Sequence, residues 1–378
     1  MKLVRSAVID DASLISSNVP ETVSAYSGTA VYVLGGQARS ADRVYESKVG
    51  ESLGTATMTI ASPCVVTRNG HGLAAGAPIC FTTTGALPTG LVAGTIYYVM
   101  AAGLTANAFQ LAATASGAAI NTSGSQSGTH TLISNPNVGK AVGDTDYWID
   151  IGPTNRMAMF DTVNGTRTAG VPTIETVTQP AGRIDCIALL NVDATSIHVT
   201  ISDAIDGVFF DEDFNMVSNS GILDIHAYYY EPVVRKADLI ITGLTPYVSP
   251  TIEITITKDG GSSQVGTFIT GQVRTMGATL ISPQVGLKDY SLIEVDDFGD
   301  YTLIPRDYSL TGNYRVSVAN GFFDEFVRLM GGCLGRATLF IMSEKFAAMA
   351  MFGIVRECTL EVPYPETSLC SLNLERLT

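Results

Sequence analysis

The sequence has few charged residues, and basic residues are the scarcer kind. Only 15% of its 378 residues are charged, and 22 lysines and arginines stand against 36 aspartates and glutamates, giving a formal net charge of −14. Proteins that bind along a nucleic acid backbone use basic side chains to replace the cations condensed on the phosphates. We therefore expect no direct nucleic acid partner.

Long apolar runs are also missing. No segment reaches the about 18 consecutive apolar residues that would indicate a membrane-spanning helix. The opening stretch MKLVRSAVIDDASL has two early basic residues but lacks the apolar centre of a signal peptide. The sequence therefore predicts no membrane insertion and no export signal.

Cysteine and histidine are sparse and scattered. The chain has 6 cysteines and 4 histidines, without a CxxC pair or a histidine cluster. A zinc site needs several such ligands close together, so we expect no metal site and no cofactor. We predict that the thiols are mostly free and buried, as in a chain that folds in a reducing cytoplasm. The cysteines are Cys64, Cys80, Cys186, Cys333, Cys358 and Cys370.

Catalytic motifs are absent as well: there is no GxSxG elbow, no HExxH helix and no GxxxxGK[ST] phosphate loop. Two acidic clusters could supply a glycosidase pair or bind calcium, but neither has the spacing of a known calcium loop. Acid-rich turns between strands are commonly just solvated, so we predict that the chain is not an enzyme. The clusters are Asp203, Asp206, Asp211, Glu212 and Asp213, then Glu294, Asp296, Asp297 and Asp300.

What the sequence does contain is strand and turn signal. Hydrophobic residues make up 46% of the chain and glycines number 37, which is typical of a folded, turn-rich protein. Alternating apolar and polar residues at 196–202 and 251–257 indicate half-buried strands. The predicted fold class is mainly β: a multi-domain antiparallel β-sandwich and barrel architecture, with an inserted small β-barrel and one or two short helices.

The domain prediction follows changes in composition. Residues 56–134 are rich in Thr, Ala, Gly and Ser and almost uncharged, with short β-type runs between Gly, Pro and Asn, which predicts an inserted small barrel. Its flanks, 1–55 and 135–165, would form one split β module. Residues 166–270 are predicted to be a β-sandwich and 271–378 a C-terminal β-rich domain.

Within the sandwich, we expect residues 184–192 to pair with 196–202. Residues 251–257 and 264–271 flank a Lys-Asp-Gly-Gly turn and are predicted to form a hairpin. The segment 226–234, HAYYYEPVV, is predicted to be a further strand.

The clearest helix signal lies near 322–330. Acidic residues fall in its first turn and a pair of glycines follows it, as helix ends favour. Its apolar face consists of Phe322, Phe323, Phe326, Leu329 and Met330.

The stretch DTDYWIDIGPTNRMAMFD, residues 144–161, holds the only tryptophan, Trp148. One interpretation is a core aromatic whose indole N–H finds a buried partner. Another is a sugar platform, since flat aromatic faces suit sugar C–H groups. The candidate carbohydrate-binding residues are Trp148, Tyr26, Tyr32, Tyr45 and Tyr147.

The same stretch predicts a structural turn. Thr154 and Asn155 can hydrogen-bond their own backbone. Arg156 is expected to form a bidentate ion pair with a nearby acid that locks the turn. The nearby acids are Asp144, Asp146, Asp150 and Asp161.

Several segments resemble bacteriophage proteins. NGHGLAAGAPI, GTIYYVM and LTANAFQLAAT, within residues 69–131, resemble a small β module of tailed-phage structural proteins. That module is related to the first catalytic cysteine half-domain fold of ubiquitin-activating enzymes. The resemblance implies a fold and not ubiquitin chemistry.

Weaker resemblances lie outside this insert. The strands with Tyr26, Tyr32 and Tyr45, followed by DYWIDIGP, resemble a chitin-binding-like module that the insert splits. GPTNRMAMFD resembles a GxTNRWAMFD word of phage tail-associated proteins, with Met157 at the Trp position. Segments of phage tail and adsorption proteins also resemble the end of the chain, through Phe352, Gly353, Tyr364, Pro365, Cys370, Leu372, Leu374 and Glu375.

These resemblances imply a structural component of a tailed-phage virion, most simply of the tail or baseplate, assembled in the host cytoplasm. Its partners would be copies of itself and other virion proteins. Many short strands and little charge suit a protein that buries strand edges against its neighbours. The alternative function is a host-surface carbohydrate-binding adhesion module, for which repeated weak sites would gain avidity.

Overall fold

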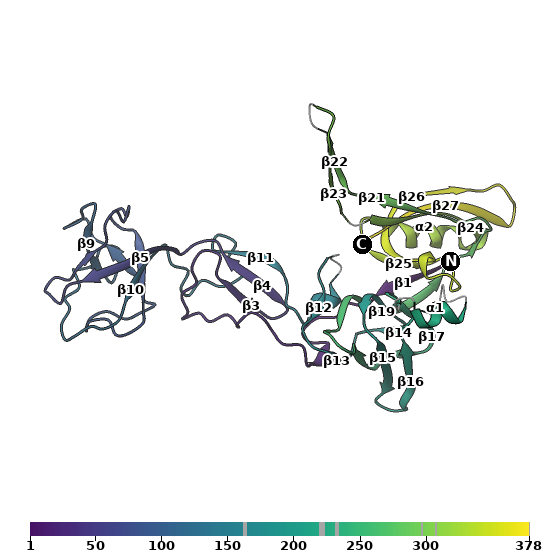
Figure 1. Cartoon of the computed structure of the whole chain (residues 1–378), viewed down its shortest axis with the longest axis horizontal. Helices are drawn as coiled ribbons and strands as arrows, with labels where there is room; N and C mark the ends of the chain where they lie inside the picture. Colours follow the sequence, from purple (N-terminus) through teal and green to yellow (C-terminus); the bar gives the residue numbers. More distant parts are fainter. Residues whose placement is uncertain (162–164, 219–223, 231–233, 296–297, 307, 378) are drawn as a thin grey trace. The chain divides into compact units, whose positions relative to one another are not determined.

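The computed structural model describes residues 1–161, 165–218, 224–230, 234–295, 298–306 and 308–377. The chain is mainly β and built from antiparallel sheets, as the sequence predicts. It divides into two compact units, shown in Figure 1. The smaller unit is Glu21–Thr154, and the larger combines Met1–Pro20 with Asn155–Thr378.

The larger unit is organised by one 11-stranded sheet. Its strands are β1 (Lys2–Ser6), β12 (Thr168–Ala169), β14 (Arg183–Asp193), β17 (Leu239–Val248), β19 (Gln264–Thr275), β20 (Ala278–Thr279), β21 (Gln284–Asp289), β24 (Tyr308–Ala319), β25 (Thr338–Ile341), β26 (Ala350–Glu361) and β27 (Thr367–Arg376). The order is β17-β14-β19-β1-β25-β26-β27-β24-β20, with β12 on β19 and β21 on β24.

A second sheet of five strands packs on one end of the large sheet. Its strands are β2 (Leu14–Ser17), β13 (Thr173–Thr178), β15 (Ser196–Asp203), β16 (Gly207–Asn215) and β18 (Thr251–Thr257). They lie in the order β16-β15-β18-β13-β2. Ile197 and Ile256 of this sheet share a core with Leu189 and Phe268 of the large sheet, which makes a β-sandwich.

Two strand pairings predicted from the sequence are wrong. β14 and β15 lie in opposite sheets, and so do β18 and β19. β14 is buried on both faces through most of its length, so it takes β17 and β19 as neighbours instead of a hairpin partner. The two connections that cross the sandwich are joined by an ion pair between Lys258 Nζ and Asp193 Oδ2, 2.6 Å apart.

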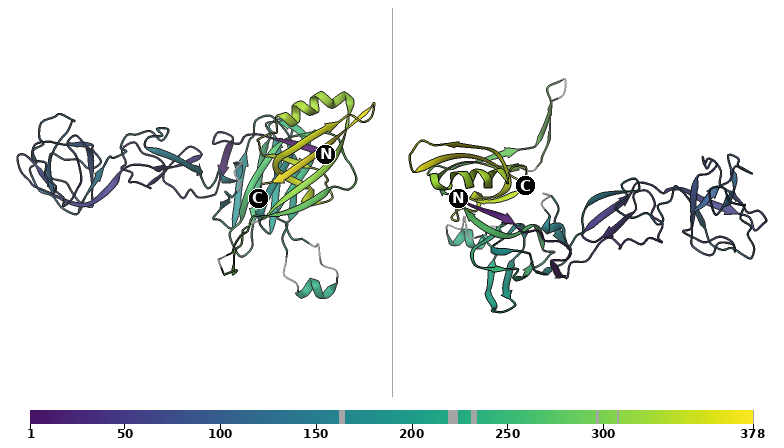
Figure 2. Two further views of the ribbon diagram at one scale, coloured as in Figure 1. Left: turned by 90° about the horizontal axis from the view of Figure 1, so that it is seen from above. Right: turned by 180° about the vertical axis from the view of Figure 1, so that it is seen from behind.

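The predicted helix near 322–330 is confirmed as α2, Phe323–Gly331. Its buried residues pack with Tyr314, Val316 and Leu372 of the C-terminal strands. Figure 2 shows this helix beside the yellow strands. The other short elements of the larger unit are η1 (Ala158–Phe160), α1 (Ile225–Tyr230), β22 (Leu292–Val295), β23 (Tyr301–Ile304), η2 (Asn320–Phe322) and η3 (Ala347–Met349).

The strand predicted at 226–234 is also wrong. Helix α1, Ile225–Tyr230, covers its first part, and 231–233 lie outside the described residues. Consecutive tyrosines favour strands only where a neighbouring strand pairs with them, because β propensity depends on tertiary context.

The predicted domain boundaries also differ from the structure. Residues 1–20 were assigned to the split module but belong to the larger unit. β1 lies between β19 and β25, and its Leu3 and Val4 are fully buried. This strand joins the predicted sandwich at 166–270 and the predicted C-terminal domain at 271–378 into one sheet.

The smaller unit holds a closed barrel and a three-stranded sheet. Its strands are β3 (Gln37–Ser40), β4 (Arg43–Ser47), β5 (Glu51–Met58), β6 (Val65–Thr67), β7 (Pro78–Thr83), β8 (Tyr97–Val99), β9 (Ala108–Ala112), β10 (His130–Ser134) and β11 (Trp148–Pro153). The barrel order is β10-β5-β6-β9-β8-β7, and the sheet order is β11-β4-β3. The inserted small barrel is thus confirmed, and Val66, Phe81, Phe109 and Leu132 fill its core.

The α2 contact predicts a large stability difference between two neighbouring residues. Phe326 is fully buried, whereas Val327 is 45% exposed. We expect Phe326→Ala to lower the free energy of unfolding by about 3–5 kcal/mol, since it opens a cavity. Val327→Ala should change it by less than about 0.5 kcal/mol. Denaturant unfolding of the full chain measures both, and equal effects would contradict this packing.

Candidate functional site

Trp148 lies in the core of the smaller unit. Its side chain is 2% exposed, and the rings of Tyr26 and Tyr32 pack edge-on against it with centroids 5.8 and 5.0 Å away. The indole Nε1–H donates to the Lys140 carbonyl oxygen at 3.0 Å, and the Tyr26 hydroxyl donates to the same oxygen at 2.8 Å. A ring so enclosed has no open face on which a sugar could stack.

The other predicted sugar-binding residues are more accessible. Tyr26, Tyr32, Tyr45 and Tyr147 are half-buried. Lys140 Nζ lies 4.5 Å from the centre of the Tyr147 ring, which places this tyrosine next to the Trp148 cluster. Tyr45 lies on β4, in register with Ala38 and Asp150. Carbohydrate binding by these tyrosines stays a prediction.

The predicted turn at 154–156 links segments distant in sequence. Asn155 Nδ2 donates to the carbonyl oxygens of Ala169 at 2.8 Å and Pro20 at 3.2 Å, and its Oδ1 accepts from the Ala169 amide. Thr154 is fully buried, and its amide donates to the Asp42 carbonyl. The prediction that Thr154 and Asn155 bond their own turn is therefore corrected. Asn155 instead connects three segments of the chain, around residues 20, 155 and 169.

The structure also brings Arg156 to an acid outside the group that the sequence indicates. Arg156 Nη2 lies 2.8 Å from Asp11 Oδ1, at the far end of the sequence. Asp150 instead makes the bidentate pair with Arg43, through Nε at 2.9 Å and Nη2 at 2.8 Å. The sequence pattern indicated the right residue types, but it could not show that the fold brings Asp11 to Arg156.

The first acidic cluster lies on the hairpin of β15 and β16. Asp213 Oδ1 is 2.9 Å from His198 Nδ1, and Asp211 Oδ1 is 3.2 Å from His198 Nε2. This histidine is 39% exposed and points away from the sandwich core, as its place in the strand alternation predicts. Among the described residues, no three His, Cys, Asp or Glu side chains converge as a metal site would require.

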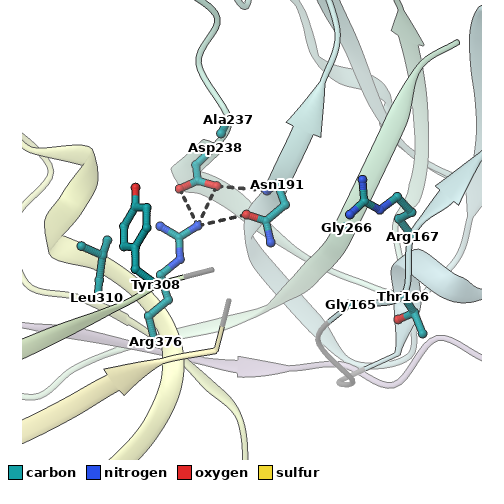
Figure 3. A pocket seen from close by; sticks show the side chains of 10 residues that line it. All are labelled: Gly165, Thr166, Arg167, Asn191, Ala237, Asp238, Gly266, Tyr308, Leu310 and Arg376. Carbon is teal, nitrogen blue, oxygen red and sulfur yellow. Dashed lines mark hydrogen bonds and ion pairs between the residues drawn. The ribbon is translucent and has the colours of Figure 1, made fainter. Parts of the chain in front are cut away.

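A polar pocket of about 450 Å³ lies beside Arg376, near the end of β27. In Figure 3, the Arg376 guanidinium points toward Asp238 and Asn191, and its Nη2 lies 3.1 Å from Asp238 Oδ2. Asp238 is the one carboxylate among the described lining residues and is already paired, so these residues offer no acid and base couple. The contacts instead hold β27 against the start of β17.

A larger groove of about 750 Å³ lies between β16, β17 and the turn that follows β25. We call it the β16–β17 groove. Its charged lining residues are Glu212, Lys236, Asp238, Glu344 and Lys345, and its uncharged ones are Phe210, Phe214, Ile240, Ile241, Thr242, Ile341, Ser343, Phe346 and Ala350. A lining that combines apolar side chains with a few charged groups is typical of a binding surface.

A hairpin of β22 and β23 extends from the sheet that holds β21 and β24 (Figure 1). We call its described residues, 290–295 and 298–305, the arm. All eight of its strand residues are exposed. One face carries Ile293 opposite Leu303 and Val295 opposite Tyr301, with exposed fractions of 60%, 62%, 55% and 77%. The sequence indicates strands or turns in this segment, and the alternation in LIEV and YTLI is the signal that could have indicated a hairpin.

Glu375 fixes the root of the arm. Its Oε1 accepts hydrogen bonds from the Tyr290 hydroxyl and from Lys288 Nζ, and its Oε2 accepts one from Arg356 Nε at 2.6 Å. These donors, Tyr290 and Lys288 first, hold the pKa of this carboxyl down at about 2. A buried carboxylate thus joins β21, β26 and β27 where the arm begins.

The six cysteines are free thiols, as predicted. Five are buried, and burial raises the pKa of Cys80 and Cys186 to about 12. The Sγ atoms of Cys358 and Cys370 lie 3.5 Å apart across β26 and β27. Because their pKa is raised by burial, the thiols of Cys80 and Cys186 are protonated at neutral pH and are poor nucleophiles.

Within the described part of the chain, no helix combines the length and apolar character needed to cross a membrane.

Comparison with known proteins finds no family model, no curated protein and no solved structure that matches this chain.

Because Trp148 is the only tryptophan, its fluorescence reports on the aromatic cluster alone. We expect a blue-shifted emission that acrylamide quenches weakly in the folded chain and strongly in the unfolded one, since the ring is buried. Titration with oligosaccharides should leave the quenching unchanged. A sugar that protects or exposes the ring would contradict this placement.

The Glu375 network predicts a pH-dependent stability. Its folded-state pKa of about 2 lies below the ordinary 4.5, so its contribution is complete above the ordinary value. It is lost as the pH falls from there through the folded-state pKa. Glu375→Gln should therefore lower stability at neutral pH and flatten the decline in acid. Urea unfolding across this range measures it, with exposed Glu361→Gln as control; parallel curves for Glu375→Gln and the unmodified chain would refute the network's role.

Proposed function

We propose that this chain is a structural component of a tailed-phage virion, of its tail or baseplate. It would act through homo-oligomeric assembly and contacts with neighbouring virion proteins, and it would be assembled in the host cytoplasm. The sequence resemblances at 69–131 and 152–161 support the phage origin. The observation that carries the assembly role is the arm, whose apolar face is uncovered in the single chain.

An isolated two-stranded hairpin is marginal in water, and soluble monomers rarely expose clustered apolar side chains. The arm combines both features, and its root is held in place by Glu375. Such an arrangement suits a protein whose final environment is an assembly that covers the arm. The residues that resemble the phage module belong to the small closed barrel of the smaller unit.

A second candidate is carbohydrate binding on the host surface. The observation that favours it is a cluster of half-buried tyrosines: Tyr26 stacks on Tyr32 and donates to the Lys140 carbonyl oxygen, and Lys140 Nζ lies over the Tyr147 ring. A glycan array of the full chain tests it. Tyr147→Ala should abolish any signal that this cluster produces, while Tyr301→Ala on the arm should leave it unchanged.

Quantitative mass spectrometry of purified particles tests the virion role. We expect a fixed copy number per particle that is a multiple of the rotational symmetry of the tail. The major capsid protein serves as the internal standard, and host proteins that copurify set the background. Absence from washed particles would reject the proposal.

A further inference from the structure

We propose that the arm of one copy docks into the β16–β17 groove of a second copy of this chain. The inference rests on the homo-oligomeric assembly proposed above and names the two surfaces that would meet. Both surfaces belong to the larger unit, so each copy offers one of each.

The arm needs a partner because its stability has no local source. Its strand residues pair only with each other in the described structure, and none of the eight is even half-buried. Burying exposed Leu and Ile side chains is favourable in proportion to the apolar area removed from water. A partner that covers the face formed by Ile293, Val295, Tyr301 and Leu303 would therefore stabilise both the arm and the complex.

The groove can accept an extended strand. Ile240, Ile241 and Thr242 are consecutive in β17 and all line it, and since consecutive strand residues point to opposite faces, the groove runs along the strand edge. Among the described strands, β17 pairs with β14 alone, so its other edge is open. An open edge beside apolar pockets is the surface that binds an added β-strand.

Charge selects the arm as the occupant. Residues 290–305 contain four acids, Glu294, Asp296, Asp297 and Asp300, and no lysine or arginine. In the groove, Asp238 is paired with Arg376 and Glu344 with Lys2, whereas Lys236 and Lys345 have no ion pair within the described residues. These two lysines outnumber the one remaining acid of the lining, Glu212, so the unpaired charge of the groove is opposite in sign to that of the arm.

The second copy is the occupant because the arm does not reach a groove within its own copy. Its strand residues are all exposed, and the hydrogen bonds to Glu375 hold the arm at its root. An arm that enters the groove of the next copy makes a heterologous contact. Contacts of this type close into rings when the rotation permits, which suits the symmetry of a tail.

The first experiment measures self-association of the full chain by sedimentation, with Leu303→Asp and Ile149→Asp as matched variants. Leu303 lies on the apolar face of the arm, whereas Ile149 is an exposed apolar residue on β11 of the smaller unit. We expect Leu303→Asp to weaken association by roughly tenfold to a hundredfold. Ile149→Asp should change it by less than about threefold, with circular dichroism unchanged in both.

The second experiment identifies the receiving surface. Glu294→Lys on the arm and Lys345→Glu in the groove should each weaken association. The double variant should recover it, because every arm–groove contact in that chain again joins opposite charges. Exposed Glu361→Lys changes the net charge by the same amount and is the control. Combining it with Lys345→Glu should not restore the association that Lys345→Glu weakens.

A chain that stays monomeric at all concentrations would overturn the inference. So would association that Leu303→Asp leaves unchanged, or single variants that the double variant fails to rescue. Particle mass spectrometry separates the two proposals. Arm-dependent association without incorporation into particles rejects the virion role alone, whereas incorporation with arm-independent association rejects the docking alone.

Discussion

The larger unit depends on the insertion of β1 between β19 and β25. This strand pairs with both neighbours, and its alternating residues enter two cores on opposite faces of the sheet, Leu3 with α2 and Val4 with β14. Without it, the strands of the sandwich and the C-terminal strands would have no hydrogen-bonded continuity. The arm, the groove and the Arg376 pocket all lie on elements that this one strand joins, so their geometry follows from a pairing between the first residues of the chain and segments more than 250 positions later.

The sequence predicted elements well where local signals are complete. Short β-type runs between glycines located the barrel, and the acids and glycines around residues 323–331 located α2. Pairing was harder to predict, because period-two alternation identifies the buried face of a strand but not its sheet. β14 and β15 show this: each has a clear pattern, yet the short turn between them crosses the sandwich instead of closing a hairpin.

The candidate sites show the same limit. Sequence reasoning singled out Trp148 because it is unique, and it offered two interpretations, of which the burial of the ring and the hydrogen bond to Lys140 fit the core aromatic. Arg156 lies among acids in the sequence, but ion pairs form between side chains that the fold brings together, and the fold also brings Asp11 to Arg156. The groove was invisible because its lining comes from three separate segments of the chain.

The composition of the arm balances two opposing requirements. A free copy must not aggregate through an exposed apolar ribbon, and charges placed on strand edges are the usual protection against this. The sequence of residues 290–305 contains four acids, and in a chain of net charge −14 they add to the electrostatic repulsion between copies. A local site where lysines outnumber unpaired acids is an exception to that repulsion. In the docking we propose, the acids that keep the free arm soluble would also restrict it to one groove, so solubility and specificity would come from the same residues.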